Sequence, residues 1–154
     1  MQTELTALFD KLQRSAVTKL LVSGALAIKA GSSALARTVA TMYFMIDGKV
    51  YSKAAADCAA LSGTVTNAKF NVFVFTINAA GTLATTMGTE ASTLGGVTFP
   101  SIAEGSVAYG FVIVNPTGTG NFVGGTTALD DATVVPNAVY VNTLGEFLPE
   151  LVTL

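Results

Sequence analysis

The side chains that could carry chemistry in this 154-residue chain are few. Histidine is absent, which removes the commonest general base, the usual zinc ligand and every histidine-based triad. The single cysteine, Cys58, lies in an alanine-rich stretch with Asp57 as its only candidate base. A small thiol in such apolar surroundings is expected to be buried and unreactive. One cysteine also excludes an internal disulfide.

Asp130 and Asp131 form the only acidic doublet of the chain. Carboxylates with Asn or Thr oxygens nearby suit Ca²⁺, but the ligand spacing of a known calcium loop is missing. An Asx-type turn is therefore the default interpretation, and whether the doublet binds a cation stays open. We expect no cofactor and no metal site.

Two glycine-rich runs, residues 118–120 and 124–127, invite comparison with phosphate-binding loops. A Walker loop needs a lysine directly after its last glycine, and no lysine occurs beyond Lys69. A dinucleotide-binding loop opens a helix, and no helical pattern follows here. These glycines are expected to serve turns and close approach of backbones. Together with the missing histidine, this predicts that the chain is not an enzyme.

Charge is scarce in this chain and unevenly distributed. Charged residues are 12% of the composition. The first 69 residues hold all eight bases and four acids, a net charge of +4, whereas the rest holds six acids and no base, a net charge of −6. The bases are spaced singly, without the clustering on one element that nucleic-acid binding requires. We therefore expect no nucleic-acid partner.

Apolar residues make up 51% of the chain, a large share to combine with so few charges. One interpretation is a compact sandwich with a Thr, Ser, Asn and Gly surface. The interpretation that we favour is that copies of the chain, or a partner, cover part of the apolar surface. No run of about 18 apolar residues occurs and the N-terminus is polar, so neither a membrane span nor a signal peptide is expected.

Residues 3–14 have the periodicity of an amphipathic helix. The apolar side chains follow the i, i+3, i+4, i+7 pattern of one helical stripe: Leu5, Leu8, Phe9 and Leu12. A helix of about twelve residues is marginal alone, so this stripe must pack against something. It either caps the sheet of its own chain or packs on another subunit, and the pattern leaves both open. We assign residues 1–15 to an N-terminal helical segment.

From residue 16 onward the chain reads as strands and turns. Asp47-Gly48 between two apolar runs is a strong signal for a type I′ hairpin. Residues 70–77 form an apolar run on both faces, which is typical of a strand between two packed layers or at a subunit interface. Further strands are expected at 19–23, 25–30, 39–46, 106–114 and 138–142. We predict a mainly β fold over 16–154, a single β-sandwich domain or small barrel preceded by the N-terminal helix.

The runs 94–102, 110–116, 122–130 and 139–142 resemble, in their sequence of strands and turns, structural proteins of tailed-bacteriophage virions. The resemblance is to small head proteins of the decoration or cement kind. It implies a multicopy protein, a homotrimer, that binds the major capsid protein on the outer capsid surface and stabilises the head by multivalent packing. It also implies synthesis in the host cytoplasm, residence in the virion, and no active site.

Candidate assembly contacts follow from both lines of reasoning. They are the helical stripe and one aromatic of the glycine-rich loop: Leu5, Leu8, Phe9, Leu12 and Phe122. An alternative from another class is a receptor- or carbohydrate-binding module of a phage fibre or tail tip. That alternative predicts exposed aromatic side chains in loops, for which only Phe99 and Phe122 lie near turns.

Overall fold

A computed structural model describes residues 2–147, without the side chains of residues 14 and 15. Met1 and residues 148–154 lie outside the described residues, and so does the predicted end of the domain. The fold is mainly β with one N-terminal helix, as predicted. The elements are α1 (Gln2–Val17), β1 (Lys19–Val22), β2 (Leu26–Ile28), β3 (Ala36–Thr38), β4 (Met42–Ile46), β5 (Lys49–Lys53), β6 (Thr64–Val65), β7 (Asn71–Asn78), β8 (Leu83–Met87), the 3₁₀ turn η1 (Leu94–Gly96), β9 (Ser106–Val114), β10 (Phe122–Val123) and β11 (Val139–Asn142).

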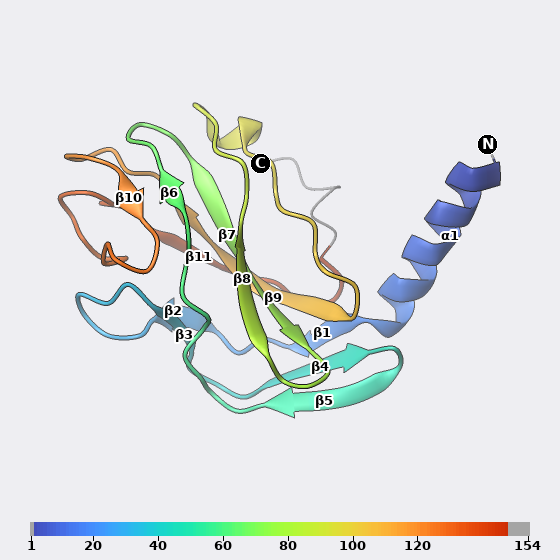
Figure 1. Ribbon diagram of the computed structural model, residues 1–154. Coiled ribbons are helices and arrows are strands. Elements are labelled where there is room, and N and C mark those ends of the chain that lie inside the picture. The colour runs from blue at the N-terminus through green and yellow to red at the C-terminus, as the bar shows by residue number, and fades with distance from the viewer. Residues whose placement is uncertain (1, 148–154) are drawn as a thin grey trace.

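Two antiparallel sheets form the body of the molecule (Figure 1). One has the strand order β1-β4-β5 and the other β11-β9-β7-β8. The inward side chains of both sheets meet in one hydrophobic core, where Leu20 and Phe44 of the first sheet join Phe75 and Tyr109 of the second. Each of these four side chains is at most 1% exposed. This confirms the predicted sandwich, because each sheet must bury one apolar face against the other.

The strand β7 is buried on both faces within its own chain. Phe73, Phe75 and Ile77 point into the core between the sheets, and Val72 and Val74 point the opposite way. The second side is a separate core, in which Phe99 packs edge-to-face on Phe111 with ring centroids 5.0 Å apart. Residues 88–105 supply much of the cover for this second core. Of the two predicted settings for this strand, the middle of two packed layers is correct.

The Asp47-Gly48 hairpin is confirmed in its backbone conformation. The φ angle is 50° at Asp47 and 77° at Gly48, and a type I′ turn needs both to be positive. The hairpin between β7 and β8 closes at Asn78, whose carbonyl accepts from Gly81 N–H at 2.9 Å. Its side-chain oxygen also accepts from Thr82 N–H at 3.0 Å.

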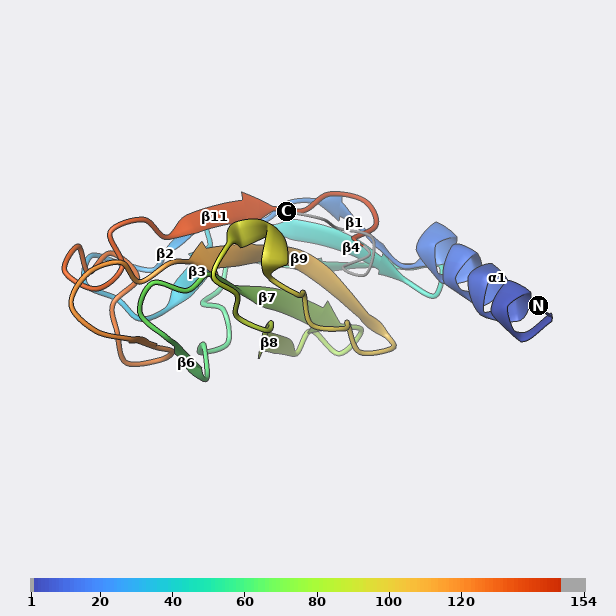
Figure 2. The same cartoon turned by 90° about the horizontal axis from the view of Figure 1, so that it is seen from above.

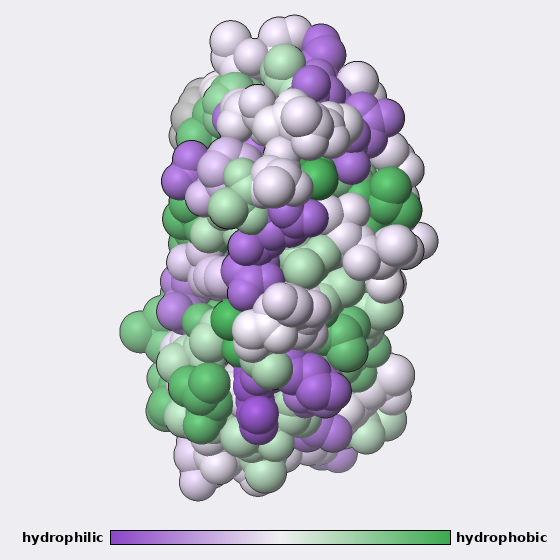
Figure 3. All heavy atoms as spheres, turned by 90° about the vertical axis from the view of Figure 1, so that its left-hand side faces the viewer, coloured by the Kyte–Doolittle hydropathy of each residue, from purple (hydrophilic) through white to green (hydrophobic). Residues whose placement is uncertain are grey.

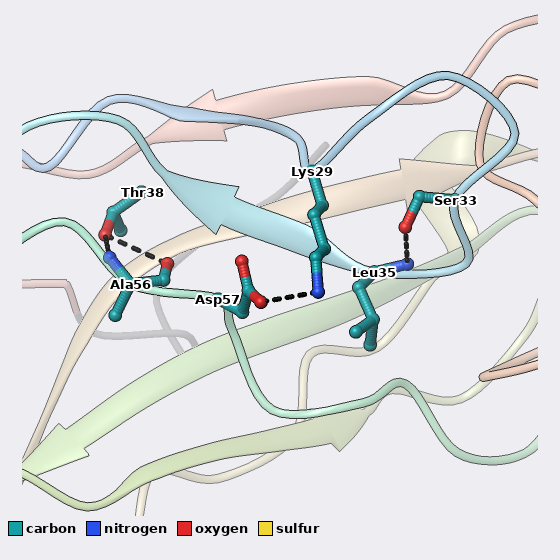
Figure 4. A network of polar contacts seen from close by, with 6 residues as sticks. All are labelled: Lys29, Ser33, Leu35, Thr38, Ala56 and Asp57. Atoms are coloured by element: carbon teal, nitrogen blue, oxygen red, sulfur yellow. Dashed lines mark hydrogen bonds and ion pairs between the residues drawn. The ribbon is translucent and has the colours of Figure 1, made fainter.

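Two short two-stranded sheets, β2-β3 and β6-β10, lie at the end of the sandwich farthest from α1 (Figure 1). Residues 56–58 run beside β3. There Cys58 N–H donates to Ala36 O at 2.9 Å, and Thr38 exchanges hydrogen bonds with Ala56. The half-exposed ion pair Lys29–Asp57, 2.7 Å long, closes this contact on the surface (Figure 4). The network ties β2 and β3 to the following segment and is structural.

Candidate assembly surface

The N-terminal helix projects away from the sandwich and does not lie on it (Figures 1 and 2). It is longer than predicted, spanning Gln2–Val17. Its apolar stripe is exposed to solvent: Leu5 by 53%, Leu8 by 54%, Phe9 by 60% and Leu12 by 56%. The stripe therefore does not cap the sheet of its own chain, which was one of the two placements considered. Packing on another subunit stays a prediction.

The base of the helix is held by the β4–β5 hairpin turn. Gly48 N–H donates to the carbonyl oxygen of Val17 at 2.9 Å, which satisfies one of the last helical carbonyls. Asp47 N–H donates to the hydroxyl oxygen of Thr18 at 3.2 Å. The type I′ turn thus presents its two backbone donors to the end of α1. These contacts fix where the helix leaves the sandwich.

The outward side of the three-stranded sheet carries a second group of exposed apolar side chains. Val22 lies opposite Tyr43 across the β1–β4 pair, and Met45 lies opposite Val50 across the β4–β5 pair. Val22, Tyr43 and Val50 are 47%, 46% and 62% exposed, and Met45 is half-buried. Residues directly opposite in an antiparallel pair share one face, so these four side chains form one patch, here called the outer face.

Exposed apolar surface is concentrated at the end of the molecule that carries α1 and the three-stranded sheet. Within residues 2–147, all but three of the exposed large apolar side chains belong to α1, β1, β4, β5 or Leu144. Leu144 precedes Gly145, whose backbone pairs with Leu20 of β1, so it lies beside the same sheet. The opposite end of the sandwich shows small green areas separated by pale and hydrophilic ones (Figure 3). An apolar helix and an apolar sheet face at one end are the mark of an interaction site.

Burial raises the pKa of three side chains that lie in or against the core: Cys58, Tyr109 and Tyr140. Cys58 is buried, as predicted, and burial raises the pKa of its thiol to about 11. Burial also raises the pKa of Tyr109 well above its usual range, and that of Tyr140 to about 12. Both tyrosine hydroxyls are buried without a hydrogen-bond partner among the described residues. At neutral pH these three groups are protonated.

Asp130 and Asp131 cap turns. Both carboxylate oxygens of Asp130 accept from Ser32 N–H, at 3.1 and 2.9 Å. Asp131 accepts from the hydroxyl of Thr133 at 2.6 Å and from its N–H at 2.9 Å, and these bonds lower the pKa of the Asp131 carboxyl. The default interpretation as an Asx-type turn therefore describes Asp131 well. Within residues 2–147 no three His, Cys, Asp or Glu side chains gather as metal ligands.

Phe122 is not an assembly contact, contrary to the sequence prediction. Its side chain is 0% exposed and packs edge-to-face on Phe73, with ring centroids 5.8 Å apart. The reason is that β10 pairs with β6, which turns Phe122 into the core opposite Val65. Phe99 is also buried, at 8% exposure. The two loop aromatics on which the carbohydrate-binding alternative depended are therefore core residues.

The glycine-rich loop is built by close contacts between backbones, as predicted. A Cβ on Gly118 would overlap the carbonyl group of Thr133. A Cβ on Gly124 would lie 2.9 Å from the backbone carbonyl carbon of Leu61. Gly125 has a φ of 74°, which favours glycine. The loop is thus closed against the body of the chain.

Comparison with protein-family models, with curated protein sequences and with solved structures finds no match for this chain. The resemblance to phage head proteins therefore stays a prediction. Among the described residues, no helix has the length and apolar character needed to cross a lipid bilayer.

Proposed function

We propose that this chain is a structural protein that works as one subunit of an oligomer, with its N-terminal helix as the principal contact between subunits. The observation that carries the proposal is the exposure of more than half of each apolar side chain in the α1 stripe. A helix of 16 residues is marginal in water without packing of its apolar face. Other copies of the chain are the partners that are always present to cover it.

The sandwich supports this proposal by being a self-sufficient body. Its two cores are closed within one chain, so α1 is left over as a projecting arm. In its specific form the proposal is a capsid decoration protein, a trimer that binds the major capsid protein of a phage head. That form rests on the sequence resemblance.

The test compares two matched double variants of the full chain. Leu5 and Leu8, on the stripe, are both changed to Gln; in the control, Thr3 and Ala7, on the other side of α1, are both changed to Gln. Gln is a good helix former, and all four positions are exposed to solvent, so both variants should keep the fold. Each is analysed by size-exclusion chromatography with light scattering.

We expect the unmodified chain and the control to form an oligomer of the 15.7-kDa subunit, a trimer in the decoration form of the proposal. The stripe variant should be a monomer with an unchanged circular dichroism spectrum in the β region. A monomeric unmodified chain, or an oligomer that the stripe variant leaves intact, would contradict the proposal.

A further inference from the structure

We propose that α1 of each copy lies on the outer face of the three-stranded sheet of a neighbouring copy. This inference rests on the proposed oligomer and says what covers the helix within it. In a closed ring, the helix of each subunit packs on the next subunit, and the outer face of each subunit is covered by the helix of the previous one. The partner is therefore a second copy of this chain, and the contact joins two different surfaces.

The first argument is that each copy carries two apolar surfaces that it cannot bring together itself. Val17 O and Thr18 Oγ1 are bound to the Gly48 and Asp47 N–H groups, and from there α1 points away from the sheet (Figure 2). The outer face of the same copy stays exposed at Val22, Tyr43 and Val50. Exchange between copies covers both surfaces with one contact.

The second argument is that contact between helices alone is too small. The stripe of α1 extends over barely two heptads, whereas coiled coils sustain their repeat over three or four. Stable complexes bury about 800 Å² on each partner, more than one stripe of four side chains supplies. In an exchanged ring every subunit buries a helix stripe and an outer face, so the buried apolar area of each subunit comes from both.

The third argument is that the two surfaces match in size. Sixteen helical residues at about 1.5 Å each span about 24 Å. The five-residue strands β4 and β5 are about 17 Å long, and three strands at about 4.8 Å spacing are about 14 Å wide. One helix therefore covers the outer face along its whole length. Tyr43 lies on the central strand β4 and Val50 on the adjacent edge strand β5, so both are within the width that the helix would cover.

The experiment uses cysteines placed at single positions in the full chain. Cys58 does not interfere, because it is buried and burial raises its pKa to about 11. One variant carries Leu8→Cys on the helix together with Val50→Cys on the outer face, and each substitution is also made alone. The control pairs Leu8→Cys with Thr86→Cys, an exposed position on β8 of the other sheet. A short bifunctional maleimide then alkylates and links neighbouring thiols, and the products are separated by denaturing electrophoresis.

We expect linked dimers and trimers from the Leu8→Cys/Val50→Cys variant, and only monomers from each single variant and from the Thr86→Cys control. Linkage in Leu8→Cys alone would mean that helices meet helices, and would overturn this inference while the proposed oligomer stands. Equal linkage in the Thr86→Cys control would reveal random collision and also overturn it. An oligomer that does not link refutes the exchange alone, whereas a monomer by light scattering refutes the proposed function as well.

Discussion

The four-stranded and the three-stranded sheets differ in what covers their outward sides. The four-stranded sheet is covered on one side by the opposite sheet and on the other by residues 88–105, so every residue of β7 except Asn78 is buried. The three-stranded sheet has the same inner core but exposes Val22, Tyr43 and Val50 on its other side. The chain closes one sheet completely and leaves the other half-open beside an exposed helix. Whether the outward side of a sheet is buried in this fold thus depends on whether another segment of the same chain packs on it.

The largest expected effect comes from comparing the loss of a phenylalanine in the buried core with the loss of one on the exposed helix. Phe75→Ala removes a side chain that is 0% exposed, and should lower the free energy of unfolding by about 3–5 kcal/mol. Phe9→Ala removes one that is 60% exposed, and should leave the stability of the sandwich within about 0.5 kcal/mol. Urea unfolding followed by tyrosine fluorescence measures both. Equal destabilisation at low protein concentration would mean that α1 packs on its own sandwich.

A smaller effect separates the two sides of the three-stranded sheet at neighbouring positions. Met42 is 0% exposed and points inward, so Met42→Ala should cost about 2–5 kcal/mol of unfolding free energy. Tyr43 is 46% exposed and points outward, so Tyr43→Ala should cost less than about 1 kcal/mol in the monomer. Light scattering should show that only Tyr43→Ala, of these two, weakens association without unfolding the chain. If the Tyr43→Ala protein is stable and fully associated, the outer face does not contribute to association.

The smallest effect is a dependence of stability on acid pH at the cover of the four-stranded sheet. Thr66 donates its N–H and its hydroxyl to Glu90, both at 2.8 Å, and these bonds lower the pKa of the Glu90 carboxyl below its usual 4.5. Stabilisation from a lowered carboxyl pKa is complete above the unfolded value and is lost as pH falls through the folded one. The thermal stability of the chain should therefore fall as the pH drops below about 4.5, and it should fall less in Glu90→Gln. An unchanged acid limb in that variant would show that Glu90 contributes nothing.

Much of the sandwich could be predicted because its signals are local. Asp47-Gly48 specifies a turn by the positive φ that both residues need, and the strand 106–114 ends where Asn115-Pro116 stops it. Phe122 could not be placed, because its neighbours are turn residues and its burial depends on pairing with a strand some 57 positions earlier in the chain, at Val65.

The outer face cannot be predicted from the sequence for a related reason. The run 39–46 looks apolar on both sides, and only the pairing of β1, β4 and β5 decides which side is exposed. Its alternation of buried Met42, exposed Tyr43 and buried Phe44 appears once the sheet is assembled. The helical stripe, by contrast, was readable from its spacing alone, since a 3.6-residue period needs no distant partner. The surface on which the stripe packs cannot be predicted in this way, because it is a property of the assembly.

The most direct measurement of the central claim is hydrogen exchange of backbone amides in α1 and β7 at several protein concentrations. The account predicts that α1 amides are protected in the concentrated protein and lose protection on dilution, because only other copies stabilise the helix. The amides of β7 should stay protected throughout, since their cover belongs to the same chain. Amides of α1 that exchange as fast as those of an unfolded peptide at every concentration, or that stay protected in a dilute monomer, would contradict it.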